Sequence, residues 1–321
     1  IETTDITALS TAAVAVLSTA AVAALTTNQV GVLSTRQIQA LTTADAAALT
    51  TNQVVALTSA QIGALTTAQA AVLNTAQASA IETTDITALS TAAVVALTTD
   101  AVAALTTNQV AALTTTQTRA IETRDAAVLT SNQVAAMTSA QIGALTSSQV
   151  QAMTTAAVAA IQTADLTALS AAVIGVLSTA TIAGLTTDQM ATLTSVQIGG
   201  LKTGQAAVLS SNQVAAIMTT GITALTTAAI AALTTGAVAA LTTNQVGVLS
   251  TAQVQALTTA DVAVLSTAQT VALTSAQVGA LTTRQAAVLN TAQAAAIETT
   301  DITALSTAAV AVLSTAAVAA L

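Results

Sequence analysis

The sequence predicts an all-α solenoid, a superhelix of very short capped helices with one helix in every eight residues. A large apolar residue returns at every eighth position from Ile1 to Leu321 without a slip in register. A helix-start signal follows each of these residues, and the chain is rich in Ala, the residue with the highest helix propensity. The chain has no Pro, Phe, Trp or Tyr, which is atypical of an ordinary globular core and indicates a repeat architecture.

The repeating unit is an octad, which we number from its large apolar residue as position 0. Position 0 is always Leu, Ile or Met, position 1 is mainly Ser or Thr, and position 2 is Ser or Thr except at Ala171. Position 4 is usually Gln or Asp, position 5 is usually Val or Ile, position 7 is small, and positions 3 and 6 vary most. Residues 1–321 therefore form one continuous domain of 40 octads that ends on Leu321, and we expect it to be a segment of a longer array.

The spacing of the apolar positions favours helix over strand. Val30 at position 5 and Leu33 at the next position 0 would lie on opposite faces of a strand, because successive strand side chains alternate. In a helix they are three residues apart and share one face. Positions 4, 5 and 0 then point inward, while positions 3, 6 and 7 point outward. A β-solenoid is the alternative, but the sequence lacks the Gly, Asn or Asp turns that its corners require.

The chain must bend once in each octad. Eight helical residues advance about 80° beyond two full turns, so the leucines of one continuous helix would never align. The bend lies at positions 0 to 4: Thr26–Gln29 has the Thr-x-x-Gln pattern of a capping box, and Leu25 and Val30 have the spacing of a hydrophobic staple. Position 2 is an alternative cap, because it is the stricter hydroxyl position and position 1 also admits Lys, Met and Glu.

Helices this short are unstable alone, so the octads are expected to fold only as a stack. A longer recurrence suggests how the stack turns. An Asp at position 4 returns every 40 residues, at Asp5, Asp45, Asp85, Asp125 and Asp165. Forty residues are five octads, one candidate for a superhelical turn. Two-octad hairpins and four-octad turns are alternatives, and gene duplication would leave the same pattern.

The composition argues against several classes of function. Without His, Cys or Tyr, and with one Lys, the chain has almost no groups for catalysis, so we predict that it is not an enzyme. It has no basic patch, which argues against nucleic acid as a partner. No apolar run approaches the ~20 residues of a membrane-spanning helix.

The remaining chemical candidates are carboxylates. A Glu at position 1 and an Asp at position 4 occur together in four octads: Glu2 and Asp5, Glu82 and Asp85, Glu122 and Asp125, Glu298 and Asp301. Such oxygen ligands from adjacent coils suit Ca²⁺. One pair offers too few oxygens, however, and acids are favoured at helix starts. We therefore expect no metal site and no cofactor, and keep calcium as the alternative.

Two other patterns have a functional and a structural explanation. The regular hydroxyl pairs suggest an ice-binding array, but we expect these hydroxyls to be consumed as helix caps. Gly31, Gly63, Gly143 and Gly199 all occupy position 6. They could line a ligand groove, but tight contact between coils is the expected reason.

The octads resemble a known kind of repeat. The phrases "LTTNQVGVLST", "LTSAQIGALTT" and "IETTDITALST" are similar to the long octapeptide-repeat regions of very large bacterial secreted or cell-surface proteins of the adhesin type. The resemblance covers the whole chain and implies an extracellular, structural setting. It carries over no catalytic or binding residues.

The sequence as a whole predicts an extracellular fibre, filament or stalk. Its expected partner is itself, through end-to-end and lateral contacts, because the first and last octads lack polar caps and charged residues make up only 6% of the chain. The alternative is a module that presents a repetitive face to polysaccharide, to ice or to another cell surface.

Overall fold

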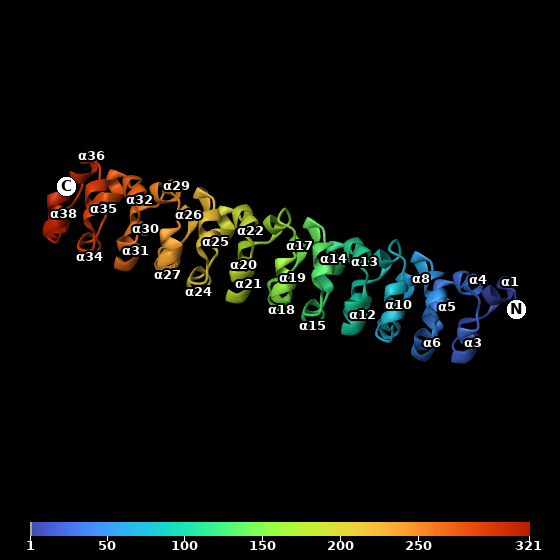
Figure 1. Ribbon diagram of the computed structural model, residues 1–321. Coiled ribbons are helices and arrows are strands. Elements are labelled where there is room, and N and C mark those ends of the chain that lie inside the picture. Colours follow the sequence, from blue (N-terminus) through green and yellow to red (C-terminus); the bar gives the residue numbers. More distant parts are fainter. Residues whose placement is uncertain (1) are drawn as a thin grey trace. The chain divides into compact units, whose positions relative to one another are not determined.

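The computed structural model describes residues 2–321 (Figure 1). These described residues form 38 α-helices of four to six residues and two 3-10 helices, one element in each octad, and no strand. The predicted all-α solenoid is therefore confirmed, and the β-solenoid alternative is wrong. Within the same residues, no helix has the length and apolar character needed to cross a membrane.

Position 1 is the N-cap of each α-helix. In α4 (Thr27–Gly31), the backbone N–H of Gln29 donates to Thr26 Oγ1 at 3.2 Å. The backbone N–H of Thr26 donates in return to Gln29 Oε1 at 2.8 Å, which completes the predicted capping box. Lys202 and Met218 also occupy the N-cap position, although neither side chain supplies a cap bond. Position 2 is the first helical residue, so the alternative assignment of the cap to position 2 is wrong.

Burial follows the octad. In the octad of residues 145–152, Leu145 at position 0, Gln149 at position 4 and Val150 at position 5 are buried. Ser148 at position 3 and Gln151 at position 6 are exposed. The core is therefore built from positions 0, 4 and 5, as the helical spacing predicts.

Within each compact unit, a helix packs on the helices three octads before and after it. Two extended residues, such as Leu41 (φ −59°, ψ 136°) and Thr42 (φ −69°, ψ 164°), form the corner between consecutive helices. Three such corners return the chain to its previous coil. The five-octad turn suggested by the recurring Asp residues is therefore wrong, as are the two-octad and four-octad alternatives.

The first compact unit, Ile1–Ala168, contains three stacks of helices, each made of every third element along the chain. Its first stack consists of α1 (Thr3–Ala8), α4 (Thr27–Gly31), α7 (Thr51–Val55), α10 (Thr75–Ala80), α12 (Thr99–Ala104), α15 (Thr123–Ala126) and α18 (Ser147–Ala152). Its second consists of α2 (Thr11–Val14), α5 (Thr35–Ala40), α8 (Ser59–Ala64), η1 (Ile86–Ala88), α13 (Thr107–Ala112), α16 (Ser131–Ala135) and α19 (Thr155–Ala159). Its third consists of α3 (Thr19–Ala23), α6 (Thr43–Ala48), α9 (Thr67–Ala70), α11 (Thr91–Ala96), α14 (Thr115–Ala120), α17 (Ser139–Ala144) and η2 (Leu166–Ala168).

The second compact unit, Leu169–Leu321, has the same organisation. Its first stack consists of α20 (Ala171–Ile174), α23 (Ser195–Gly199), α26 (Thr219–Ala224), α29 (Thr243–Gly247), α32 (Thr267–Val271), α35 (Thr291–Ala296) and α38 (Thr315–Ala320). Its second consists of α21 (Thr179–Gly184), α24 (Thr203–Ala206), α27 (Thr227–Ala232), α30 (Thr251–Ala256), α33 (Ser275–Gly279) and α36 (Thr299–Ile302). Its third consists of α22 (Thr187–Thr192), α25 (Ser211–Ala216), α28 (Thr235–Ala239), α31 (Thr259–Ala263), α34 (Thr283–Ala286) and α37 (Thr307–Val310).

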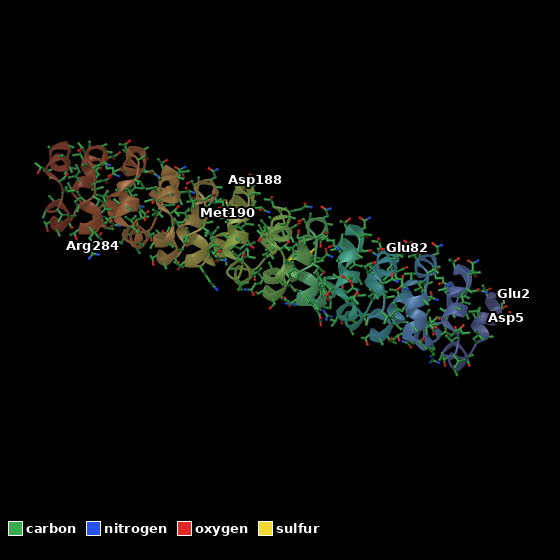
Figure 2. The ribbon with its side chains drawn as sticks, turned by 60° about the horizontal axis from the view of Figure 1, so that its bottom comes forward. Glu2, Asp5, Glu82, Asp188, Met190 and Arg284 are labelled. Atoms are coloured by element: carbon green, nitrogen blue, oxygen red, sulfur yellow. The ribbon has the colours of Figure 1, made fainter. Side chains whose placement is uncertain are left out.

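The apolar interior of the second unit is closely packed. Val246, Val254 and Leu257 are among the side chains that surround a cavity of only about 10 Å³. Such a volume holds no more than one water molecule. Met190, from α22, is fully buried in this unit, whereas Arg284, from α34, points away from the ribbon (Figure 2).

Candidate functional site: the inter-coil ladder

The Gln side chain at position 4 joins two coils. The backbone N–H of Thr58 donates to Gln61 Oε1 at 2.8 Å, so this oxygen belongs to the capping box of α8. Gln61 Nε2 donates to two carbonyl oxygens of an earlier coil, Val30 O at 2.8 Å and Leu33 O at 2.7 Å. The buried amide thus uses its acceptor for its own helix and its donors for a helix about 30 residues earlier.

The same bonds, to carbonyls 31 and 28 residues earlier, recur within each unit as a ladder that is interrupted where position 4 is not Gln. We call these residues the ladder glutamines. In the first unit they are Gln37, Gln53, Gln61, Gln69, Gln77, Gln109, Gln117, Gln133, Gln141 and Gln149. In the second they are Gln205, Gln213, Gln245, Gln253, Gln269, Gln277, Gln285 and Gln293.

The ladder supplies hydrogen-bond donors to the carbonyls at the ends of these short helices. The last four carbonyls of an α-helix have no donor within the helix. In a helix of about six residues, most of the carbonyls therefore lack an intrahelical donor. Each ladder glutamine supplies donors to carbonyls at positions 5 and 0, where an earlier helix ends. One signal in the sequence points to this role: position 4 is never Glu. Glu completes a capping box as well as Gln does, but an ionised Glu has no donor.

Asp at position 4 takes one of two arrangements, depending on position 1. Where position 1 is Thr, Asp accepts from its own cap, as in the 2.6 Å bond from Thr42 Oγ1 to Asp45 Oδ2. Where position 1 is Glu or Gln, and with the exception of Asp5, Asp accepts from a position 2 hydroxyl 26 residues earlier. These bonds join Ser59 to Asp85, Thr99 to Asp125, Ser139 to Asp165 and Ser275 to Asp301.

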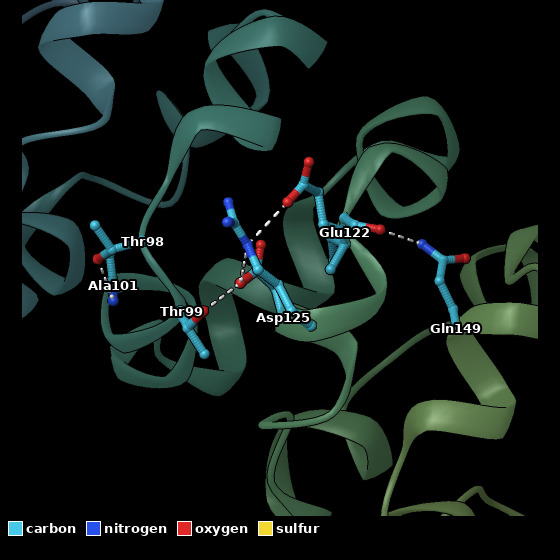
Figure 3. A network of polar contacts seen from close by, with 8 residues as sticks. Thr98, Thr99, Ala101, Glu122, Asp125 and Gln149 are labelled. Atoms are coloured by element: carbon cyan, nitrogen blue, oxygen red, sulfur yellow. Dashed lines mark hydrogen bonds and ion pairs between the residues drawn. The ribbon is translucent and has the colours of Figure 1, made fainter.

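The hydrogen bond between Thr99 and Asp125 lies beside the ion pairs of Arg124 (Figure 3). Thr99 Oγ1 donates to Asp125 Oδ1 at 2.8 Å. Arg124 Nε lies 2.8 Å from Glu122 Oε2 and 3.5 Å from Asp125 Oδ1. The Asp125 side chain is fully buried, and its Oδ2 has no hydrogen-bond partner. Gln149 Nε2 donates to the carbonyl of Ile121 at 2.7 Å, which places this cluster against the ladder.

The eight candidate calcium ligands stay in pairs. In the first pair, the backbone N–H of Glu2 donates to Asp5 Oδ2 at 2.9 Å, and both residues are exposed (Figure 2). In the pairs Glu82 and Asp85, and Glu298 and Asp301, the Glu is exposed and the Asp is buried. Throughout residues 2–321, no group of three or more His, Cys, Asp or Glu side chains is placed to hold a metal ion. That the chain needs no calcium stays a prediction.

The two hydroxyl positions have different roles. The hydroxyls at position 1 are consumed as caps, as predicted. At position 2, Thr27 and Thr107 are exposed, and their side chains make no hydrogen bond to the described residues. The expectation that both hydroxyls serve as caps is therefore wrong for position 2.

Glycine at position 6 marks close approach between coils. A Cβ atom at Gly63 would lie 3.0 Å from the carbonyl oxygen of Ala88, and one at Gly143 would lie 3.2 Å from that of Ala168. These distances are tighter than ordinary van der Waals contact. Tight packing explains these glycines, as predicted, although Gly31 also lines a groove with Thr27 and Val32.

The sequence matches a family model described as the ALTTAQ repeat. The matched segments are residues 1–35, 30–59, 78–115, 119–155, 158–195, 214–251, 222–259, 254–291 and 294–321. No curated protein and no solved structure matches the chain. The family match confirms the octapeptide-like repeat that the sequence predicts.

Proposed function

Because the chain belongs to the ALTTAQ repeat family, we propose that it is a structural protein, an extracellular fibre, filament or stalk without catalytic activity. The observation that supports this function most is the ladder. Wherever a ladder glutamine occupies position 4, the same bonds join an octad to the previous coil of its unit, so each further octad of this kind adds the same interface again. The length of the folded stack then increases with the number of octads.

Apolar side chains that are incompletely covered in the first and last coils support self-assembly. Leu9 and Leu17 in the first coil, and Leu25 directly after it, are only half-buried at position 0, whereas later leucines of the first unit are buried. In the last coil, Val310 and Val318 at position 5 are 43% and 50% exposed. These groups are covered wherever another octad stacks on them. The next octad comes from the same chain or from a second copy, and contacts of this head-to-tail kind propagate.

The setting of this function follows from the sequence phrases. Their resemblance to octapeptide-repeat regions of bacterial adhesin-like proteins supports a place outside the cell or on its surface. Residues 1–321 would then serve as one continuous spacer domain.

Sedimentation and electron microscopy of the 321-residue chain test this proposal. We expect filaments whose length increases with protein concentration, and thicker bundles at higher concentration. A chain that stays monomeric from dilute to concentrated solution, without filaments, would contradict self-assembly.

A second candidate function is supported by the exposed polar surface. Between two coils of the second unit lies a groove of about 550 Å³, lined by residues that include Thr258, Thr259, Thr282, Thr283 and Arg284. Hydroxyls and one guanidinium offer hydrogen bonds to a polysaccharide, and the unbonded position 2 hydroxyls offer a repetitive array to ice. Retention of the chain on immobilised polysaccharide, lost in Arg284→Ala, would favour this binding module. Inhibition of ice recrystallisation would favour its ice-binding form.

A further inference from the structure

The charged residues of the second unit are unevenly distributed among its three stacks. They are Asp188, Lys202, Asp261, Arg284, Glu298 and Asp301. All of them lie in the second and third stacks, in the octads of α22, α24, α31, α34 and α36. The first stack has none in its seven octads, which are residues 169–176, 193–200, 217–224, 241–248, 265–272, 289–296 and 313–320. We call the outer surface of this first stack the uncharged stripe.

The uncharged stripe also exposes large apolar side chains. They lie in four stacked helices or at their caps. Val196 belongs to α23 and is 72% exposed, and Met218 at the N-cap of α26 is 49% exposed. Val248 at the C-cap of α29 is 41% exposed, and Val271 in α32 is 47% exposed. Helices α26, α29 and α32 follow one another in Figure 1. Each of four successive coils thus contributes one exposed apolar side chain. In the first unit, by contrast, every stack carries charged residues.

We propose that the uncharged stripe is the surface on which a second copy of this chain docks side by side. This inference rests on the proposed self-assembling function and deepens it, because it assigns the lateral contact to particular residues. Contact through the same stripe on both copies is isologous, so each copy covers the apolar side chains of the other.

Charge favours a second copy as the occupant. The chain has a net charge of −8, and two copies repel each other where their acidic residues face one another. The uncharged stripe is the one stack of the second unit on which no such residue lies. It also has no charged group with which to attract a basic or an acidic partner.

The apolar side chains of the stripe favour the same occupant. They occupy different positions of the octad, position 3 at Val196, 1 at Met218, 7 at Val248 and 6 at Val271. A partner covers them with apolar side chains of its own, and a second copy brings the same four on an equally uncharged surface.

A matched pair of substitutions tests the proposal. Val248 lies on the stripe and Val264 on the third stack, and they are 41% and 42% exposed. Both occupy position 7 as the C-cap of a five-residue helix, with φ, ψ of −97°, −3° and −94°, −3°. Val248→Lys should weaken side-by-side association, measured by sedimentation equilibrium, by about tenfold or more, because it places a charge in an apolar contact. Val264→Lys should change it by less than about twofold. Circular dichroism melting should match for both variants and verify that the fold is kept.

The outcomes separate this inference from the proposed function. If filaments and bundles form equally in both variants, the stripe is not the lateral contact, although the structural function stands. If association depends on Val248 but no filaments form, the stripe is supported and the filament is contradicted. A wild-type chain that never associates overturns both.

Discussion

Replacing one ladder glutamine should reveal how much the ladder stabilises the coil. Gln149 is suited to this because its octad contains a second glutamine, Gln151, at the exposed position 6. The backbone N–H of Thr146 donates to Gln149 Oε1 at 2.8 Å. Gln149 Nε2 donates to Thr118 O at 2.9 Å and to Ile121 O at 2.7 Å. Two longer bonds run from Thr146 Oγ1 to Gln149 Oε1 at 3.0 Å and from Gln149 Nε2 to Arg119 O at 3.2 Å. Gln149→Met keeps nearly the same volume and removes all five bonds.

The magnitude follows mainly from the three shortest of these bonds. A hydrogen bond contributes roughly 1 kcal/mol net, and a buried carbonyl left without a donor costs more. Met leaves no cavity, so packing offsets little of this loss. We expect Gln149→Met to lower the free energy of unfolding by about 3 kcal/mol. Gln151→Met should change it by no more than about 0.5 kcal/mol, because an exposed side chain exchanges its bonds with water.

The assay must detect local as well as global unfolding, since a repeat array need not unfold in one step. Urea denaturation gives the overall change. Amide hydrogen exchange should show faster exchange in residues 113–128 and 145–152, the two segments that Gln149 joins. Equal effects of Gln149→Met and Gln151→Met would refute the reasoning, because the ladder would then contribute nothing beyond a surface amide.

Three further predictions follow from the same structure. Leu145→Asp should lower the free energy of unfolding, measured by urea denaturation, by several kcal/mol because it buries an unpaired charge. Ser148→Asp, at an exposed position of the same octad, should leave it nearly unchanged. Equal tolerance of the two substitutions would contradict the inward position of Leu145. Thr99→Val should cost about 1–3 kcal/mol because it removes the hydroxyl donor of buried Asp125. Thr107→Val, at an unbonded position 2, is its control, and the same loss in both variants would show that the hydrogen bond between Thr99 and Asp125 is not stabilising. Adding a chelator should leave the melting temperature unchanged, and a large drop would make the acidic pairs calcium ligands.

The local structure could be predicted from the sequence because it depends on neighbouring residues. The pattern Thr26 to Gln29 specifies a helix start by bonds within four residues, and these bonds are present. Inward positions 0, 4 and 5 follow from helical geometry alone. Both inferences needed no knowledge of how the coils stack.

The number of octads in each coil could not be predicted in this way. It depends on the corner angles at residues such as Leu41 and Thr42, which no local pattern specifies. The recurring Asp residues suggested five octads, but their spacing reflects a different constraint. Asp85 and Asp125 occur where position 1 lacks a hydroxyl, and each takes its hydroxyl donor from 26 residues earlier.

The hydrogen bonds that glutamine donates to another coil were not predicted, although the sequence contains a sign of them. A capping box accepts Glu or Gln, so the absence of Glu at position 4 needs a separate reason. That reason is the donor half of the amide, which faces carbonyls such as Val30 O in another coil. A Glu there would bury a carboxylate against carbonyl oxygens, at a cost of several kcal/mol.

The direction of the ladder bonds gives the stack a polarity. Each ladder glutamine donates toward earlier octads, as Gln61 does to Val30 and Leu33. A stack that stops beside ladder glutamines presents amide donors at its earlier end and carbonyl acceptors at its later end, whereas residues 1–24 have Asp5, Ala13 and Ala21 at position 4 and offer no Gln amide there. An end-to-end contact is therefore head to tail, and it leaves the same two ends open for the next copy. Side-by-side docking through the uncharged stripe uses none of these groups. Length and thickness of an assembly would then depend on different residues, and substitutions in the ladder and in the stripe should change them separately.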